Sequence, residues 1–319
     1  MLTALEICAG GGGQALGVEQ AGFGHAALVE VDRWACETLR LNRPKWNVVE
    51  GDLHNFTAEG LAIDLLAGGV PCPPFSTAGK QLGADDERDL FPQALRLVEE
   101  CHPRAVMLEN VRGLLSPKFD DYRDELTTRL RDLGYWSDWA LLNASDFRVP
   151  QLRPRAILVA LPHEAAARFE WPQPQPGEAP TVGEALREAM ASGGWEGADE
   201  WASGADRIAP TLVGGSKKHG GPDLGPTRAK REWATLGVCG MGIADAPPPQ
   251  GHRGPPRLTV PMAARVQGFP PDWHFAGRKT HAYRQVGNAF PPPVARAVAG
   301  AIRDALTVAE VPQANLAAA

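Results

Sequence analysis

The sequence predicts an α/β fold built on a mostly parallel sheet, with a second and smaller domain inserted in its later half. Short apolar runs alternate with helical patterns over the first 160 residues, as in βαβ units. Two proline-rich segments, 171–180 and 246–256, then enclose a glycine-rich stretch of weak periodicity. Glycine and proline supply 35 and 29 of the 319 residues, above the roughly 12% they form together in average chains. This excess excludes a coiled coil and a helical repeat.

Each expected element follows from a local pattern. Short apolar runs bounded by turn residues predict strands over 3–8, 25–32, 47–52, 62–67, 105–109, 139–143 and 156–160. Apolar residues at helical spacing predict helices over 14–21, 33–41, 91–101, 121–133 and 293–310. The last two strands have no helix between them, so we expect an antiparallel hairpin at the sheet edge. The last helix is expected to pack back on the first domain.

The composition narrows the class of protein. Apolar residues at 44% and charged residues at 22% exclude disorder as the main state. No apolar run reaches the roughly 18 residues of a membrane span, and the first residues lack the basic region of a signal peptide. Five scattered cysteines without a Cys-x-x-Cys pair indicate reduced thiols in a cytoplasmic protein, with no disulfide frame and no metal site. A net charge of −6 requires any nucleic-acid contact to rest on a local patch.

A glycine-rich turn, Cys8–Gly17, lies between the first strand and the first helix. Glycines there let the backbone approach a ligand at the start of a helix. Glu30 ends the second strand about 20 residues later, where an acid can bind two ribose hydroxyls. The pair indicates a nucleotide-like cofactor without separating a dinucleotide from S-adenosylmethionine. A plain tight turn beside a solvated Glu30 is the structural alternative.

The segment 68–76, Gly-Gly-Val-Pro-Cys-Pro-Pro-Phe-Ser, follows the fourth strand. Ligands of open parallel sheets bind at the carboxyl ends of the strands, so Cys72 is expected at the cofactor crevice. A lone cysteine is more often a buried apolar residue, but prolines on both sides favour a rigid, exposed one. Glu109 and Asn110 end the fifth strand at the same rim, and the segment 151–155 supplies two arginines near the last strand. Taken alone, each of these two sites also has a purely structural interpretation: Glu109 and Asn110 as a helix cap, and the two arginines as a surface pair.

With these residues in place, the chain resembles the C5-cytosine DNA methyltransferases. Nine motifs occur in the family's order and cover most of residues 3–300, with a break between about 163 and 255. They are the segments 5–13, 30–32, 51–53, 70–76, 88–91, 109–111, 151–155, 257–270 and 285–289. The resemblance implies a Rossmann-like S-adenosylmethionine methyltransferase domain at 1–171, a target-recognition domain at 172–280, and a C-terminal segment, 281–319, that packs back on the catalytic domain.

The resemblance also implies the chemistry. The Cys72 thiolate adds to C6 of a cytosine flipped out of the DNA duplex, and C5 then takes the methyl group of S-adenosylmethionine. Glu109 holds N3 and the amine of the base. Arg153 and Arg155 hold the base and the residues around the thiolate, and their positive charge lowers the pKa of Cys72. Asn110 positions the loop that carries Cys72. Residues 76–89, with Ser76 and Arg88 among the expected DNA contacts, form a loop that closes over the DNA.

Cofactor contacts carry over in the same way, with S-adenosylhomocysteine as the product and no metal. The expected residues are Gly10, Gly12, Gly13, Glu30, Val31, Asp52, Leu53, Leu90 and Asn288. Asp52 is expected at the adenine amine, Leu53 and Leu90 against the ring, and Asn288 near the methionine carboxylate. The chain departs from the family at Cys8, where a Phe is common, and at Val31, where some members have an aromatic residue. Met262 stands where the family usually has Glu, which removes one ion pair that supports Arg265.

The inserted region is expected to read the DNA. Residues 207–231 carry six cations against the single acid Asp223, which is typical of a phosphate- and base-contacting surface; a solvated basic loop is the alternative. The expected contacts are Thr211, Lys217, Lys218, Arg228 and Arg231. Tryptophans 195, 201 and 233 are expected in a small core instead.

Three other functions fit part of the same sequence pattern. A tRNA cytosine methyltransferase of the same fold shares almost every motif, but the large insert favours duplex DNA. A catalytically silent DNA-binding relative would be expected to lack Cys72, Glu109 or the glycines, all of which are present. A nicotinamide dehydrogenase leaves the Pro-Cys-Pro segment unexplained. We therefore expect a DNA-bound, monomeric methyltransferase of the cytoplasm and nucleoid, with a restriction endonuclease as its candidate partner.

Overall fold

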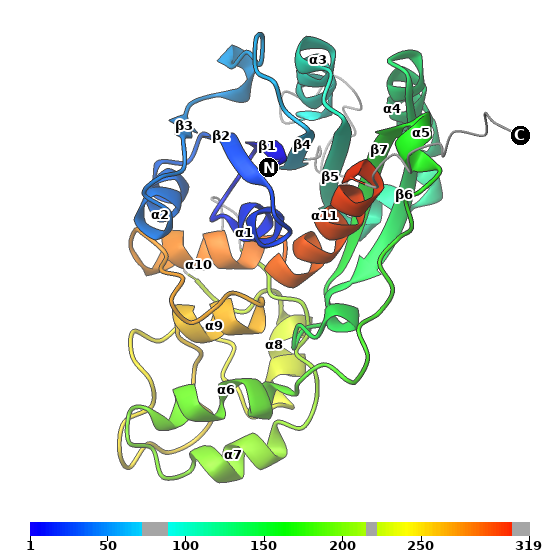
Figure 1. Ribbon diagram of the computed structural model, residues 1–319. Helices are drawn as coiled ribbons and strands as arrows, with labels where there is room; N and C mark the ends of the chain where they lie inside the picture. Colours follow the sequence, from blue (N-terminus) through cyan, green and yellow to red (C-terminus); the bar gives the residue numbers. More distant parts are fainter. Residues whose placement is uncertain (72–88, 215–221, 308–319) are drawn as a thin grey trace, which may run out of the picture.

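The computed structural model describes residues 1–71, 89–214 and 222–307. Within these ranges a single sheet has seven strands in the order β3-β2-β1-β4-β5-β7-β6 (Figure 1). Strands β1 to β5 run parallel, and β7 is antiparallel to both of its neighbours. The strands are β1 (Thr3–Ile7), β2 (Gly24–Glu30), β3 (Val48–Glu50), β4 (Leu65–Gly69), β5 (Ala105–Val111), β6 (Tyr135–Asn143) and β7 (Pro154–Pro162). The predicted α/β class and mostly parallel sheet are confirmed.

The predicted antiparallel hairpin is also confirmed, with an order that sequence could not give. The later strand, β7, lies inside the sheet beside β5, and β6 forms the edge. Strand β6 begins at Tyr135 rather than at the predicted residue 139. Gly134 has a φ of 90°, so the preceding helix ends there and the chain pairs with β7 at once, from Tyr135 opposite Pro162 to Asn143 opposite Pro154.

Helices cover both faces of the sheet (Figure 1). The helices around the sheet are α1 (Gly13–Gln20), α2 (Arg33–Asn42), α3 (Phe91–Cys101), α4 (Asp120–Asp132), α5 (His163–Ala166) and α11 (Pro292–Thr307). Apolar side chains of α3 and α4 pack with Leu5 and Ile7 on one face, and those of α1 and α11 pack with Ala4 and Leu65 on the other. The face of α11 that carries Val294 is buried against the sheet, so the last helix packs back as predicted.

The helices that follow the first proline-rich segment share a second core. They are α6 (Val182–Ala191), α7 (Ala198–Gly204), α8 (Thr227–Ala234) and α9 (Val260–Val266). Trp233 is fully buried in this core, and Trp195 and Trp201 pack against it, as predicted. Helix α10 (Lys279–Asn288) joins the two parts because it contacts both α9 and α2. The predicted boundary at residue 281 falls inside this helix.

No helix in the described ranges is both long and apolar enough to cross a membrane. The same ranges contain no group of three or more His, Cys, Asp or Glu side chains placed to hold a metal ion.

Candidate active site

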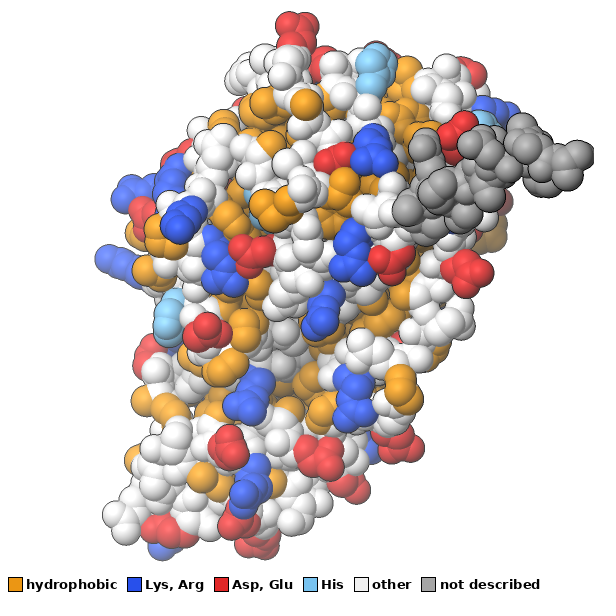
Figure 2. Space-filling view, viewed as in Figure 1, with side chains coloured by type: hydrophobic (Ala, Val, Ile, Leu, Met, Phe, Trp, Pro, Cys, Tyr) orange, Lys and Arg blue, Asp and Glu red, His pale blue; other side chains and the backbone are white. Residues whose placement is uncertain are grey.

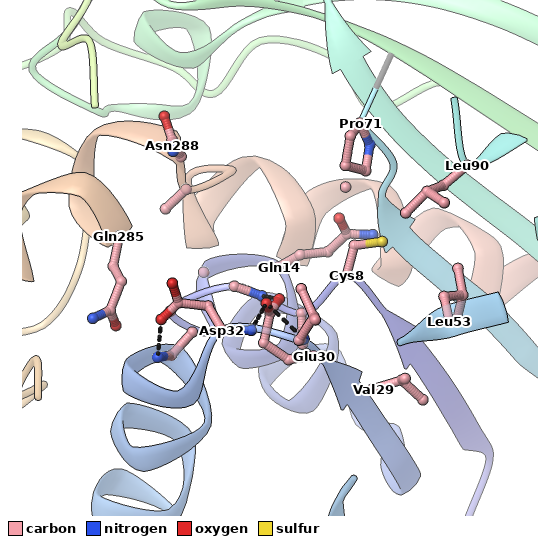
Figure 3. Close-up of a pocket in the computed structure, with 18 of the residues that line it drawn as sticks. Cys8, Gln14, Val29, Glu30, Asp32, Leu53, Pro71, Leu90, Gln285 and Asn288 are labelled. Carbon is pink, nitrogen blue, oxygen red and sulfur yellow. Dashed lines mark hydrogen bonds between the residues drawn. The ribbon is translucent and has the colours of Figure 1, made fainter. Parts of the chain in front are cut away.

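A cavity of about 760 Å³ opens at the carboxyl ends of β1, β2, β4 and β5, and α10 closes it from the opposite side. Figure 3 shows Leu53 and Leu90 along one side of the cavity, Gln285 and Asn288 along the other, and Glu30 between them. All the residues predicted to bind the cofactor line it except Gly12, which precedes α1. The parallel topology brings these distant segments together, because the strands all end at one rim.

Glu30 organises the turn that follows β1. One carboxylate oxygen accepts the Gly10 N–H at 2.7 Å, and the other accepts the N–H groups of Val31 and Asp32 at 2.9 and 2.7 Å (Figure 3). A carboxylate can accept about four hydrogen bonds, so capacity is left for a ligand hydroxyl. Burial raises the pKa of Glu30, and the three backbone hydrogen bonds oppose this rise.

The glycines make room where a ligand would lie. A Cβ on Gly13 would come within 2.3 Å of the Phe290 carbonyl oxygen, so any larger residue would push α1 away from the C-terminal segment. A Cβ on Gly10 would have only the Cys8 carbonyl oxygen within 4.0 Å, on the open side of the turn. The open space, the backbone turn and the buried acid fit a nucleoside cofactor such as S-adenosylmethionine.

The side wall of the cavity is apolar and ends in an exposed acid. Leu53 is buried and Leu90 is half-buried on the same side of the cavity (Figure 3), and Val31, another lining residue, is 70% exposed. Hydrogen bonds from the backbone and the ring of His54 lower the pKa of Asp52 and keep it ionised. An apolar slot with a carboxylate at one end fits a purine ring that carries an exocyclic amine.

Helix α10 contributes more residues than sequence reasoning found. Besides Asn288, it places His281, Arg284 and Gln285 on the cavity. The other three positions follow His281 by three, four and seven residues, a spacing that puts all four on one face of a helix. That spacing was visible in the sequence once Asn288 had been identified. Gln14 also lines the cavity, and no sequence signal pointed to it.

Glu109 and Arg155 form an ion pair at the inner end of the cavity. Arg155 Nε lies 2.6 Å from Glu109 Oε1, and both side chains are close to nine-tenths buried. Burial raises the pKa of Glu109, while the guanidinium groups of Arg155 and Arg153 oppose this rise. Burial thus favours the protonated carboxyl group, the form that a general acid requires.

Asn110 fixes the chain just before the Pro-Cys-Pro segment. Its Nδ2 donates to the Val70 carbonyl at 2.8 Å, and its Oδ1 accepts the Val111 N–H at 2.7 Å. The Leu90 N–H donates to the Pro71 carbonyl at 3.4 Å, so the described chain before residue 72 meets the described chain after residue 88. Cys72, Ser76 and Arg88 themselves lie outside the described residues.

Arg153, predicted to hold the target base and the surroundings of the thiolate, is not among the residues that line the cavity. It is fully buried and donates to the carbonyl oxygens of Leu212, Gly287 and Ala289 at 2.8, 2.8 and 3.0 Å. Arg153 therefore joins the start of β7 to the inserted domain and to the end of α10. Two arginines two residues apart could not be distinguished by sequence, because the contacts of Arg153 come from distant segments.

Three of the predicted DNA contacts can be placed. Thr211 donates its hydroxyl to the Leu152 carbonyl, so it supports the chain beside Arg153. Arg231 is exposed on α8, where Arg228 is 93% exposed and pairs with Glu232 at 3.1 Å. Lys217 and Lys218 lie outside the described residues.

The basic segment 207–231 is partly neutralised. Lys230 pairs with Asp223 at 2.6 Å, and Arg207 lies 3.8 Å from Asp206. Asp206 and Glu232, which pair with Arg207 and Arg228, lie just outside the segment. The net positive charge of this surface is therefore lower than the composition of residues 207–231 indicates. Figure 2 shows acidic and basic side chains interspersed over the face in view.

Comparisons with known proteins agree with this geometry. The Type II methyltransferase M.NaeI of Lentzea aerocolonigenes is 59% identical over 314 residues, which cover 96% of this chain and 76% of that protein. M.NgoMIV of Neisseria gonorrhoeae is 56% identical over 309 residues, covering 95% and 98%. The structure of the S. pombe Dnmt2 methyltransferase matches the fold with a TM-score of 0.64 at 18% identity, covering 96% and 100%. A model of the C-5 cytosine-specific DNA methylases matches residues 2–304, and the chain therefore belongs to this family of S-adenosylmethionine-dependent DNA methyltransferases.

Proposed function

We propose that this DNA cytosine-C5 methyltransferase flips its target cytosine out of duplex DNA and modifies it within a short specific sequence. The observation that carries the proposal is the buried Glu109–Arg155 ion pair. Glu109 lines the cofactor cavity together with Pro71 and Leu90, the residues that precede and follow the segment that contains Cys72. A cytosine that stays paired inside the base stack cannot reach a recessed carboxyl group of the enzyme, so the base has to leave the stack.

The residues divide the chemistry among them. The Cys72 thiolate forms a bond to C6, and the electron pair displaced from the C5–C6 double bond makes C5 nucleophilic. Glu109 supplies a proton to N3, which neutralises the charge that develops on the ring. When bound, S-adenosylmethionine supplies the electrophilic methyl group. Loss of the C5 proton to a base and expulsion of the Cys72 thiolate then restore the double bond.

Arg155 and Asn110 hold this arrangement. Arg155 fixes Glu109 Oε1 and leaves Oε2 for the base. Asn110 holds the Val70 carbonyl, so the end of β5 carries the acid and also anchors the chain two residues before Cys72 in sequence. Positive charge from Arg155 near the thiolate would lower the pKa of Cys72.

The biological setting follows from the relatives. Both curated relatives named above are Type II methyltransferases, so we place this chain in a restriction-modification system with a cognate endonuclease of the same recognition sequence. It acts as a monomer on chromosomal DNA in the cytoplasm. The inserted domain, 172–280, reads the sequence, and the catalytic domain, 1–171, acts on the base.

The test is covalent trapping. A duplex with 5-fluorocytosine at the target should form a stable enzyme–DNA adduct when S-adenosylmethionine is present, because fluorine cannot leave C5 as a proton does. Cys72→Ala should abolish the adduct and the turnover while cofactor binding persists. Cys101→Ala, at a half-buried cysteine outside the cavity, is the matched control and should trap normally. Methylation by Cys72→Ala, or a wild-type enzyme without an adduct, would refute the mechanism.

A further inference from the structure

Gln14 has an unusual position for an amide side chain. It lies in the first turn of α1, is only 4% exposed, and lines the cofactor cavity (Figure 3). Its Nε2 donates to the Met107 carbonyl at 3.4 Å. Its Oε1 is buried and has no hydrogen-bond partner among the described residues. A buried acceptor without a donor costs about 1–3 kcal/mol, so this oxygen is expected to meet a donor at some stage of the reaction.

The orientation of Gln14 points to that donor. A Cβ built on Gly69 would lie 3.3 Å from Glu109 Oε2 and 3.9 Å from Gln14 Oε1. Both oxygens thus converge on the space that the missing side chain of Gly69 leaves open at the end of β4. Glu109 Oε1 is already held by Arg155, so Oε2 is the oxygen that is free to carry a proton. Two acceptor oxygens that face one space are stabilised when one of them is protonated.

We propose that Gln14 is a positioning residue whose Oε1 accepts the proton on Glu109 Oε2 in the free enzyme and so holds this proton ready for the target base. The inference rests on the proposed role of Glu109 as the proton donor. No bond breaks in this step: the O–H group turns about the Cδ–Oε2 bond, from Gln14 towards N3 of the base. The amide donor of Gln14, fixed on Met107, keeps its acceptor turned towards Glu109.

In this proposal Gln14 opposes the effect of two nearby arginines on the pKa of Glu109. The guanidinium groups of Arg155 and Arg153, both in or next to β7, favour the ionised carboxylate. Gln14 faces the same space as Glu109 Oε2 and is neutral, and an acceptor there favours the protonated form. Removing the acceptor should therefore lower the pKa of Glu109, and replacing it by a negative charge should raise that pKa.

The experiment compares the pH dependence of kcat/KM for Gln14→Leu, Gln14→Glu and the wild type. Protonated Glu109 is required, so activity falls as pH rises through its pKa, and Glu109→Gln should abolish this alkaline limb. We expect Gln14→Leu to move the limb down by about 0.5–1 pH unit, the equivalent of one neutral hydrogen bond. Gln14→Glu should move it up. Gln20→Leu, an exposed glutamine on the same helix, should leave it in place.

Cofactor affinity separates the alternatives. Calorimetric titration with S-adenosylhomocysteine should give Kd values within about threefold of wild type for both Gln14 variants. An unmoved limb together with a Kd raised tenfold or more would mean that Gln14 binds the cofactor, and the inference would be wrong. Limbs that move in the same direction in both variants would also overturn it. If Gln14→Leu does not unfold cooperatively, Gln14→Met, of equal length, takes its place. Full turnover by Glu109→Gln would instead refute the proposed function itself.

Discussion

Arg155 Nε lies 2.6 Å from Glu109 Oε1, across the boundary where the parallel part of the sheet meets the antiparallel strand β7. This contact holds one oxygen of a buried acid and leaves the other for a ligand. Burial raises the pKa of Glu109 and the two nearby arginines lower it. Burial and the arginines therefore act on this carboxyl group in opposite directions, and the net shift is upwards.

Glu109→Gln should lower turnover by at least about 10²-fold, the lower end for loss of a general acid. Glutamine keeps the shape and one donor but cannot transfer a proton to N3. Binding of S-adenosylmethionine should stay within about twofold of wild type, because the cofactor groups lie elsewhere in the cavity. Steady-state methylation assays and calorimetry measure the two quantities, with exposed Glu59→Gln as the control. An equal loss in both would make Glu109 structural.

Arg153→Met should destabilise the fold by about 3 kcal/mol or more, because three buried carbonyl groups lose their donor. Arg155→Met should cost less stability, since Arg155 pairs with one carboxyl group that can take up a proton. Urea unfolding of both variants gives the comparison, and turnover should fall in both. Equal free energies of unfolding would contradict the assignment of Arg153 to the domain junction.

Glu30→Gln should raise the Kd for S-adenosylhomocysteine about tenfold or more, as expected when a charged hydrogen bond worth about 1.5–3 kcal/mol is lost. An amide has one acceptor oxygen, so it cannot accept the Gly10 N–H together with the two N–H groups on the other side. Calorimetry measures the effect. Exposed Glu59→Gln should bind as wild type does, and an unchanged Kd for Glu30→Gln would remove Glu30 from the cofactor site.

Glu6 should make stability depend on pH. Its side chain is fully buried in β1, and both carboxyl oxygens lack a hydrogen-bond partner within the described ranges. Burial raises the pKa of Glu6 well above its usual value. The folded state therefore retains a proton that the unfolded chain loses above about pH 4.3, and this group contributes less stability as pH rises from there towards its raised pKa.

Glu6→Leu should remove this dependence and raise the free energy of unfolding at pH 7 by about 1–3 kcal/mol, the cost of an unsatisfied buried polar group. Urea unfolding between pH 5 and pH 8 measures both effects. Glu59→Leu, at an exposed position, should keep the wild-type slope. A Glu6→Leu protein less stable than wild type at every pH would show that the carboxyl group has a partner.

The inserted domain should divide into two kinds of DNA contact. Lys217→Ala and Lys218→Ala should weaken binding to every sequence and lower the salt slope by about one unit each. Arg228→Ala and Arg231→Ala should cost about 1–3 kcal/mol and relax the recognised sequence at one position. Mapping of methylated cytosines and binding assays at several salt concentrations measure the effects. Arg187→Ala, on α6 with its own partner Asp199, is the control. Four mutants with the wild-type site and salt slope would place recognition elsewhere.

Several features could be predicted because local sequence dictates them. Short apolar runs made the strands visible, and their alternation with helices predicted a parallel sheet with its ligands at the carboxyl rim. Glu30, Glu109 and the glycine turn follow directly from this rule, since each ends or follows a strand. Helix α6 could also have been found: Thr181 and Glu184 form a capping box, and this signal is present in the sequence ahead of Val182 and Leu186.

Other features depend on contacts between residues far apart in the chain. Arg153 and Arg155 share one motif, yet Arg153 donates to carbonyl groups up to 136 residues away and Arg155 pairs with Glu109. Gln14 became relevant only when β4, β5 and α1 placed its amide oxygen and a carboxyl oxygen of Glu109 around Gly69. The sequence by itself determined the elements, the rim and the residue types that chemistry needs. Only the tertiary structure decided which polar groups meet, because burial and pairing are properties of the packed chain and not of a local pattern.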